Sequence, residues 1–238
     1  MISKDEGIAA VVASNVYISP KQLDIFFKHK SAHVRSFAAG NANAADYQLM
    51  EALQDEDSKV RRLAASNLSA TYAVVKQALF GESIMVRCFA TSHPRLPKEF
   101  LSEAFSSKVD DIRTAAASNP NATGAQLRAL SNADKDNYNI LCSIFDNPNV
   151  PTDLLNNAIY GDSDMRFALA KSSSATRVHL EELIETSSKD KGDDVEDEIV
   201  GIAQVRLDNF EYADYKHKGL KRQDSEQSKE LSRELSKK

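Results

Sequence analysis

An eight-residue pattern recurs along this chain at a nearly constant spacing, and no other feature of the sequence restricts its fold so strongly. The pattern reads VRSFAAGN in the copy that begins at Val34 and VRRLAASN in the copy that begins 26 residues later, at Val60. The seven copies begin at Ile8, Val34, Val60, Val86, Ile112, Ile140 and Met165. Self-similarity at a fixed period of this size predicts a solenoid, in which each repeat packs mainly against its neighbours.

A second column of apolar residues confirms the register of the repeats. Its spacing is 26 residues in the first five copies and changes to 28 and then 25 where the eight-residue pattern changes in the same way. The column consists of Leu23, Leu49, Val75, Leu101, Leu127, Leu155 and Leu180. Because two independent columns share their irregularities, the period belongs to the whole repeat.

Each repeat reads as two short helices. In the first, a column leucine is followed four residues later by another apolar residue, as in Leu49 and Leu53, which places both on one helical face. In the second, paired alanines such as Ala64 and Ala65 remove bulk, so that neighbouring backbones can approach closely. Helices of about ten residues are too short to be stable alone. The pattern therefore predicts an all-α fold in which each repeat buries its apolar faces against the next.

The helix boundaries are marked by characteristic residues. Pro20 and Pro97 resemble prolines in the first turn of a helix, where the missing N–H costs nothing. Several second helices end on an asparagine, as at Asn41 and Asn67, and this residue tolerates the left-handed conformation that closes many helices. Acids such as Asp57 stand at the starts of the second helices, where they suit the positive end of the helix dipole.

The succession VRxxAAxN, a proline turn and LxxxL resembles the leucine-rich repeat variant proteins and, more broadly, the HEAT-like α-solenoids. The resemblance covers roughly residues 8–185. It implies a right-handed α-solenoid of about seven two-helix repeats, although the unit here is shorter than the HEAT length of about 40 residues. The cysteine cluster of the founding variant-repeat protein is absent, so the resemblance implies no iron–sulfur centre.

The repeat pattern fails after Leu183, and this divides the chain into three predicted parts. Residues 1–188 form the helical repeat solenoid, and residues 189–215 form an acidic loop and a C-terminal capping helix from about Val195 to Asn209. An open-ended solenoid needs such a cap. Residues 216–238 form a charged tail that we expect to be flexible.

The amino-acid composition indicates which kinds of binding partner and which cellular compartment suit this chain. The net charge is −5, with acids concentrated in residues 190–214 and bases in residues 216–238, so the repeats themselves are nearly neutral. A uniformly basic surface for nucleic acid is therefore not predicted. The two cysteines, Cys88 and Cys142, suit a reducing compartment, and no apolar run is long enough to cross a membrane. We expect a cytoplasmic protein without membrane association.

An arginine follows the first apolar residue in five of the seven copies. This arginine column consists of Arg35, Arg61, Arg87, Arg113 and Arg166, and Leu141 interrupts it. One interpretation is a partner-binding stripe that grips carboxylates or phosphates. The other is an internal series in which each arginine neutralises acids at neighbouring helix starts. In HEAT-like proteins the second helix lines the concave face, so either arrangement borders a binding surface.

The remaining chemistry-bearing residues do not form a recognisable site. His29 and His33 are separated like a metal-binding pair, yet a repeat boundary lies between them. His93 replaces the asparagine that ends other second helices, and Cys88 and Cys142 occupy equivalent packing positions. The chain contains no nucleophile elbow, phosphate-binding glycine loop, HExxH or paired CxxC. The sequence therefore predicts no catalytic residue, no metal and no cofactor.

These features favour a non-catalytic scaffold or adaptor that binds another protein on the concave face of the repeats. The alternative is a nucleic-acid-binding protein related to the HEAT-like alkylpurine DNA glycosylases. Such enzymes need a basic groove with aromatic residues that face the damaged base. Here tryptophan is absent and the repeats carry no net positive charge, so the protein partner is the leading hypothesis.

Overall fold

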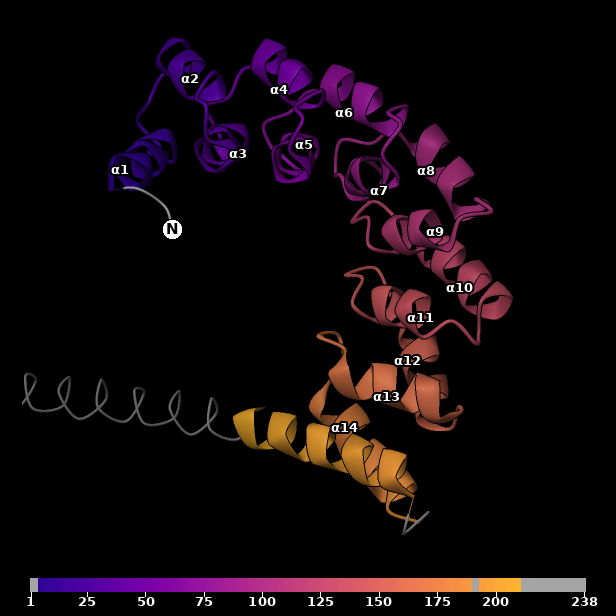
Figure 1. The fold of residues 1–238 in the computed structure, drawn as a ribbon. Coiled ribbons are helices and arrows are strands. Elements are labelled where there is room, and N and C mark those ends of the chain that lie inside the picture. The colour runs from indigo at the N-terminus through magenta and orange to yellow at the C-terminus, as the bar shows by residue number, and fades with distance from the viewer. Residues whose placement is uncertain (1–3, 190–192, 211–238) are drawn as a thin grey trace, which may run out of the picture. The chain divides into compact units, whose positions relative to one another are not determined.

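The computed structural model describes residues 4–189 and 193–210, and every regular element in these ranges is a helix (Figure 1). The helices are α1 (Lys4–Ala13), α2 (Pro20–Phe27), α3 (Ala32–Gly40), α4 (Asp46–Ala52), α5 (Ser58–Ala65), α6 (Tyr72–Leu79), α7 (Ile84–Ser92), α8 (Lys98–Phe105), α9 (Asp110–Ala117), α10 (Gly124–Ala133), α11 (Tyr138–Phe145), α12 (Thr152–Ile159), α13 (Ser163–Lys171) and α14 (Arg177–Ser187). A further helix covers residues 194–210. The predicted all-α fold is confirmed for the described residues, while the predicted flexible tail lies outside them.

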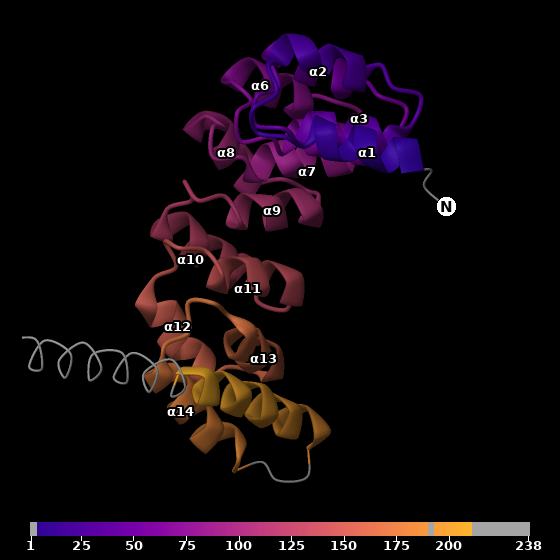
Figure 2. The ribbon, with the colours of Figure 1, turned by 90° about the vertical axis from the view of Figure 1, so that its left-hand side faces the viewer.

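The chain divides into two compact units, Met1–Pro151 and Thr152–Lys238. In the first unit the helices form two rows, visible in Figures 1 and 2. The second helices of the repeats, α3, α5, α7 and α9, pack side by side in the inner row together with α1 and α11, and the first helices form the outer row. Alternation of first and second helices between two rows is the arrangement of an α-solenoid-like helical repeat.

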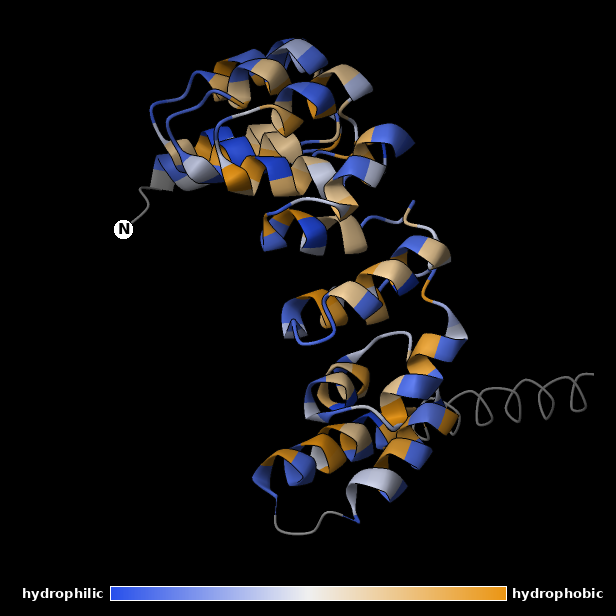
Figure 3. Cartoon of the chain, turned by 90° about the vertical axis from the view of Figure 1, so that its right-hand side faces the viewer, coloured by the Kyte–Doolittle hydropathy of each residue, from blue (hydrophilic) through white to orange (hydrophobic). Residues whose placement is uncertain are grey.

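The core of each repeat contains the apolar residues that recur with the period of the sequence. All seven residues of the column from Leu23 to Leu180 are buried, and Leu101 is only 1% exposed. In the inner row Ala38, Ala64, Ala90 and Ala116 are fully buried, so small side chains separate the packed helices. Figure 3 shows hydrophobic and hydrophilic residues alternating within single helices, as expected where each short helix buries one face. Among the described residues, no helix is long and apolar enough to cross a membrane.

Side chains cap the starts of many helices. Asp57 accepts hydrogen bonds from the backbone N–H groups of Lys59 and Val60 at the start of α5, as expected for an acid at the positive end of a helix. Pro20 occupies the first position of α2, as predicted. The assignment of Pro97 was wrong by one residue, because Pro97 is the extended residue that precedes α8.

The prediction of a left-handed conformation at the asparagine column is wrong where α3 ends. Asn41 is extended, with φ −72° and ψ 132°. Its buried Nδ2 instead donates to the carbonyl oxygens of Ala13, at 2.8 Å, and Asn15, at 3.0 Å, in the preceding repeat. Its Oδ1 accepts from the backbone N–H of Asn43 at 2.8 Å. The residue is therefore explained by a contact between repeats, because it satisfies carbonyl groups that the preceding helix leaves open.

The same arrangement recurs along the first unit. Asn67 donates to the carbonyl oxygens of Ala39 and Asn41. Asn119 and Asn147 each bond two carbonyl groups of the repeat before them. His93 replaces asparagine in the fourth copy, and its Nε2 lies 3.0 Å from the carbonyl oxygen of Asn67. A line of buried polar side chains therefore joins successive repeats.

In the second unit, the helix of residues 194–210 follows the acidic segment as predicted. Asp193 accepts from the backbone N–H of Val195 at 2.9 Å, and Ile199 and Ala203 are fully buried. Arg206 on this helix donates to the carbonyl oxygen of Ala170 in α13. The helix therefore covers part of α13.

Candidate functional site

The arginine column lies along the edge formed by the loops within the repeats. The Nη1 atom of Arg61 donates to the carbonyl oxygens of Asp55, at 2.6 Å, and Glu56, at 2.8 Å, in the loop that precedes its own helix. Arg35, Arg113 and Arg166 are anchored on the loops before their helices in the same way. Leu141, which interrupts the column, is fully buried.

Three arginines of the column form ion pairs with acids that lie about 20 to 30 residues further along the chain. Arg35 binds Asp55 through two hydrogen bonds, from Nε at 2.7 Å and from Nη2 at 2.9 Å. Arg113 binds Asp134 in the same two-point manner. In the second unit, Arg166 pairs with Glu196 of the helix over residues 194–210. These three arginines thus neutralise acids of other elements in their own unit.

Despite burial, two of these ion pairs lower the pKa values of their carboxyl groups. Burial raises the pKa of Asp55, but hydrogen bonds from Arg35 and from the backbone N–H of Asp57 outweigh it and leave the pKa below its ordinary value. The same competition, burial against hydrogen bonds from Arg166 and Ser163, lowers the pKa of Glu196. Both carboxyl groups are therefore held in the ionised form.

Arg61 and Arg87 differ from the other members of the column. Arg35 meets Asp55 and Glu56, and the repeat register places Gly81 and Glu82 at these positions for Arg61 and Ser107 and Lys108 for Arg87. Among the described residues, no acid forms an ion pair with either arginine, and the buried Nε of Arg87 has no hydrogen-bond acceptor. Within the part of the chain that the structure describes, these two adjacent members of the column thus form no ion pair.

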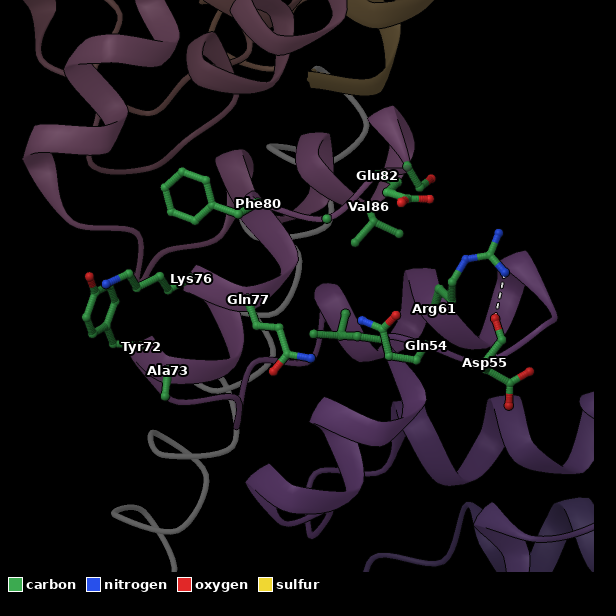
Figure 4. A pocket seen from close by; sticks show the side chains of 13 residues that line it. Gln54, Asp55, Arg61, Tyr72, Ala73, Lys76, Gln77, Phe80, Glu82 and Val86 are labelled. Atoms are coloured by element: carbon green, nitrogen blue, oxygen red, sulfur yellow. Dashed lines mark hydrogen bonds between the residues drawn. The ribbon is translucent and has the colours of Figure 1, made fainter.

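A groove of about 1190 Å³ opens beside Arg61. Its walls come from the loop after α4, from α5, from one face of α6 and from the loop before α7 (Figure 4). Figure 4 shows Arg61 and Asp55 on one side of the groove and Tyr72, Lys76 and Phe80 on the other. We call this the Arg61 groove.

A second, smaller hollow of about 410 Å³ lies between the inner helices α7 and α9. Met85, Cys88 and Phe89 form its apolar side, and Asp111 lies at its margin. Met85 is 52% exposed, and the guanidinium group of Arg62 lies over the ring of Phe89 at 5.8 Å. Burial raises the pKa of the Cys88 thiol, so this cysteine is a packing residue in its neutral form.

The inner hollow was not predicted, although the motif contains a signal for it. The fourth position of the repeated pattern is Phe37, then Leu63, then Phe89, and these large apolar residues remain partly exposed on the inner row. The predicted packing columns lie at other positions, and their side chains are buried. A large residue at the fourth position therefore indicates an apolar stripe on the inner surface.

His29 and His33 make separate local contacts. His29 accepts from the backbone N–H of Ser31 through Nδ1, and His33 packs edge-on against Phe37 at 5.0 Å. Within residues 4–189 and 193–210, no three histidine, cysteine, aspartate or glutamate side chains come close enough together to hold a metal ion.

Comparison of the chain with protein-family models, curated proteins and solved structures gave no match. The resemblance to HEAT-like repeats therefore rests on the repeated residues alone.

Proposed function

We propose that this chain is a non-catalytic scaffold that binds another protein in the cytoplasm. In this proposal the seven copies of the repeat form a right-handed, HEAT-like α-solenoid of the leucine-rich repeat variant type, and binding needs no cofactor. The partner lies against the inner helices. The support for this proposal comes from the inner surface of the first unit and from the arginine column at its edge.

The observation that carries the proposal is the apolar stripe on the inner row. Phe37, Leu63 and Phe89 come from three successive repeats and are partly exposed, and Met85 extends the stripe into the hollow between α7 and α9. Lys59 lies over the ring of Phe37 and Arg62 over that of Phe89, so positive groups border the apolar residues. An apolar centre with a polar margin is typical of a protein interface.

The alternative, a nucleic-acid-binding surface, has less support. A duplex requires many cations in line along its phosphates. Asp111 lies at the margin of the same hollow, and three arginines of the column are already paired with acids. We therefore place the protein partner first.

Co-purification of the full-length chain from its native cells tests the proposal. The informative comparison is between Met85→Glu on the inner row and Ile25→Glu on α2, where Ile25 is 71% exposed. We expect the wild type and Ile25→Glu to retain the same partner after nuclease treatment, and Met85→Glu to lose it. Equal recovery with both variants, or loss of every partner after nuclease treatment, would contradict the proposal.

A further inference from the structure

We infer that the Arg61 groove binds an acidic side chain of the partner protein, whose carboxylate forms with Arg61 the two-point contact that Asp55 forms with Arg35. The inference rests on the proposed function only in taking the ligand to be a protein segment. The bound group is a carboxylate, and the Nε and Nη2 atoms of Arg61 hold it in the groove.

The register of the column gives the acid that each arginine meets. Arg35 meets its acid 20 residues further on, at Asp55, and Arg113 meets its acid 21 residues further on, at Asp134. The residue 20 positions after Arg61 is Gly81, which has no side chain to offer. The residue 21 positions after Arg61 is the acid Glu82, but among the described residues no ion pair joins it to Arg61.

Backbone carbonyl groups fix the orientation of the Arg61 guanidinium group. Two carbonyl oxygens hold Nη1 of Arg61, at 2.6 and 2.8 Å, as two carbonyl oxygens hold Nη1 of Arg35, at 3.0 and 3.2 Å. In Arg35 the opposite edge, formed by Nε and Nη2, binds both oxygens of Asp55. Among the described residues, no acceptor bonds that edge in Arg61. The guanidinium group is thus fixed in advance for two-point binding of a carboxylate.

Positive and aromatic side chains line the groove around this edge. Lys76 supplies a second positive charge, and its Nζ lies 5.9 Å from the centre of the Tyr72 ring. Phe80 is 66% exposed and is held by an edge-to-face contact with Phe100. The rings of Tyr72 and Phe80 suit an apolar side chain that neighbours the acidic residue in the bound segment. The groove therefore offers both a second positive charge and apolar rings beside the free edge of Arg61.

The acids that line the groove indicate whether its ligand is a single carboxylate or a nucleic-acid backbone. Asp55 is engaged by Arg35, and Glu82 is exposed at the margin. Two carboxylates beside one guanidinium edge and one lysine oppose a ligand that carries a charge on every unit. A single carboxylate with an apolar neighbour meets less repulsion. The balance of charge thus favours an acidic and apolar protein segment.

The test uses the full-length chain and a capped peptide of alternating glutamate and phenylalanine as probe. The Nε–H signals of the arginines are followed by nuclear magnetic resonance while the peptide is added. We expect the Arg61 signal to shift saturably and the signals of Arg35 and Arg113 to stay in place. Replacement of every glutamate in the peptide by glutamine is expected to abolish the shift.

Variants measure how much of the binding depends on Arg61. We expect Arg61→Gln to weaken peptide binding by at least about tenfold, the effect of losing a charge-assisted two-point contact. We expect Arg61→Lys to weaken it as well, because lysine cannot bind both carboxylate oxygens in one plane. Lys21→Gln is the matched control, since it removes one exposed positive charge on α2 and should leave binding unchanged. Far-ultraviolet circular dichroism verifies that each variant is folded.

Four results would overturn the inference, and the first three concern binding of the peptide. They are equal binding by folded Arg61→Gln, equal binding of the glutamine peptide, and tighter binding of a single-stranded oligonucleotide that displaces the peptide. A native partner that co-purifies equally with wild type and Arg61→Gln also overturns it, while the scaffold proposal stands. Conversely, Arg61-dependent peptide binding without any native partner would contradict the scaffold proposal and leave the carboxylate site intact.

Discussion

Arg113 and Asp134 are joined by two hydrogen bonds across the boundary between two repeats, Nε to Oδ2 at 2.8 Å and Nη2 to Oδ1 at 2.7 Å. The side chains are only 15% and 17% exposed, so water screens the pair weakly. The equivalent arginine one repeat earlier, Arg87, has no such partner among the described residues. This contrast separates the members of the column that stabilise the fold from those that are available to a ligand.

The first prediction follows from this contrast. Arg113→Gln should lower the free energy of unfolding by about 1–3 kcal/mol, because it leaves the largely buried Asp134 without its partner. Arg87→Gln should not lower it, since no ion pair is lost and a buried unpartnered Nε–H is removed. Urea unfolding of both variants at the same pH measures the difference. A larger loss in Arg87→Gln than in Arg113→Gln would show that the pairing is misassigned.

The asparagine column gives a second prediction. Asn67→Ala leaves the buried carbonyl groups of Ala39 and Asn41 without their donor and should cost about 2–4 kcal/mol. Asn67→His should cost less, because His93 already makes a contact of this kind in the next repeat. Thermal and urea unfolding of the two variants provide the test. Equal stability of Asn67→Ala and wild type would mean that the contact contributes nothing.

His93 makes the stability of the first unit depend on pH. Burial lowers the pKa of His93, and the hydrogen bond to the Asn67 carbonyl opposes this shift only in part. Because the folded state disfavours the protonated ring, stability is complete above the unfolded pKa of about 6.5 and falls as the pH drops from there toward the folded pKa. His93→Asn should remove this part of the pH dependence, since asparagine does not titrate.

The measurement for His93 is the free energy of unfolding at about pH 8 and about pH 5.5 for wild type and His93→Asn. We expect a smaller decrease in the variant. Some decrease should remain, because burial also lowers the pKa of His179. An identical decrease in both proteins would rule out His93 as a source of the pH dependence.

The repeat period of the sequence predicts much of the fold. The column that contains Leu101 could be predicted as core because its spacing and that of the Val-Arg pattern share the same irregularities, and every member is buried. The conformation of Asn41 could not be predicted from local preference. Its side chain bonds carbonyl groups of the preceding repeat, and that contact outweighs the tendency of asparagine toward the left-handed region.

The candidate site was predicted less completely. The arginine column and its two interpretations follow from the sequence, but the partner of Arg166 does not, because Glu196 lies in a helix outside the repeat pattern. The lack of an ion pair at Arg61 among the described residues becomes meaningful only when the Arg35–Asp55 contact is known. The Arg61 groove depends on which faces of α6 and the neighbouring loops remain uncovered, and a periodic pattern does not determine this.

Burial of the leucine column gives a further prediction. Leu101→Asp places a charge in the core of the first unit and should cost more than about 3 kcal/mol, because a carboxylate there has neither water nor a cation. Ile25→Asp adds the same charge at an exposed position of α2 and serves as the control, with little expected effect. Circular dichroism during thermal unfolding distinguishes the two. An unchanged melting temperature in Leu101→Asp would mean that the core is assigned to the wrong face.

The most direct test of the scaffold proposal is site-specific photo-crosslinking in native cells. A photoreactive phenylalanine analogue is placed at Met85 on the inner row in one variant and at Ile25 on the outer row in another. The account predicts that the Met85 position captures one recurring protein, identified by mass spectrometry, and that the Ile25 position does not capture it. Capture of that protein from the outer position and not from the inner one would contradict the assignment of the inner helices as the binding surface.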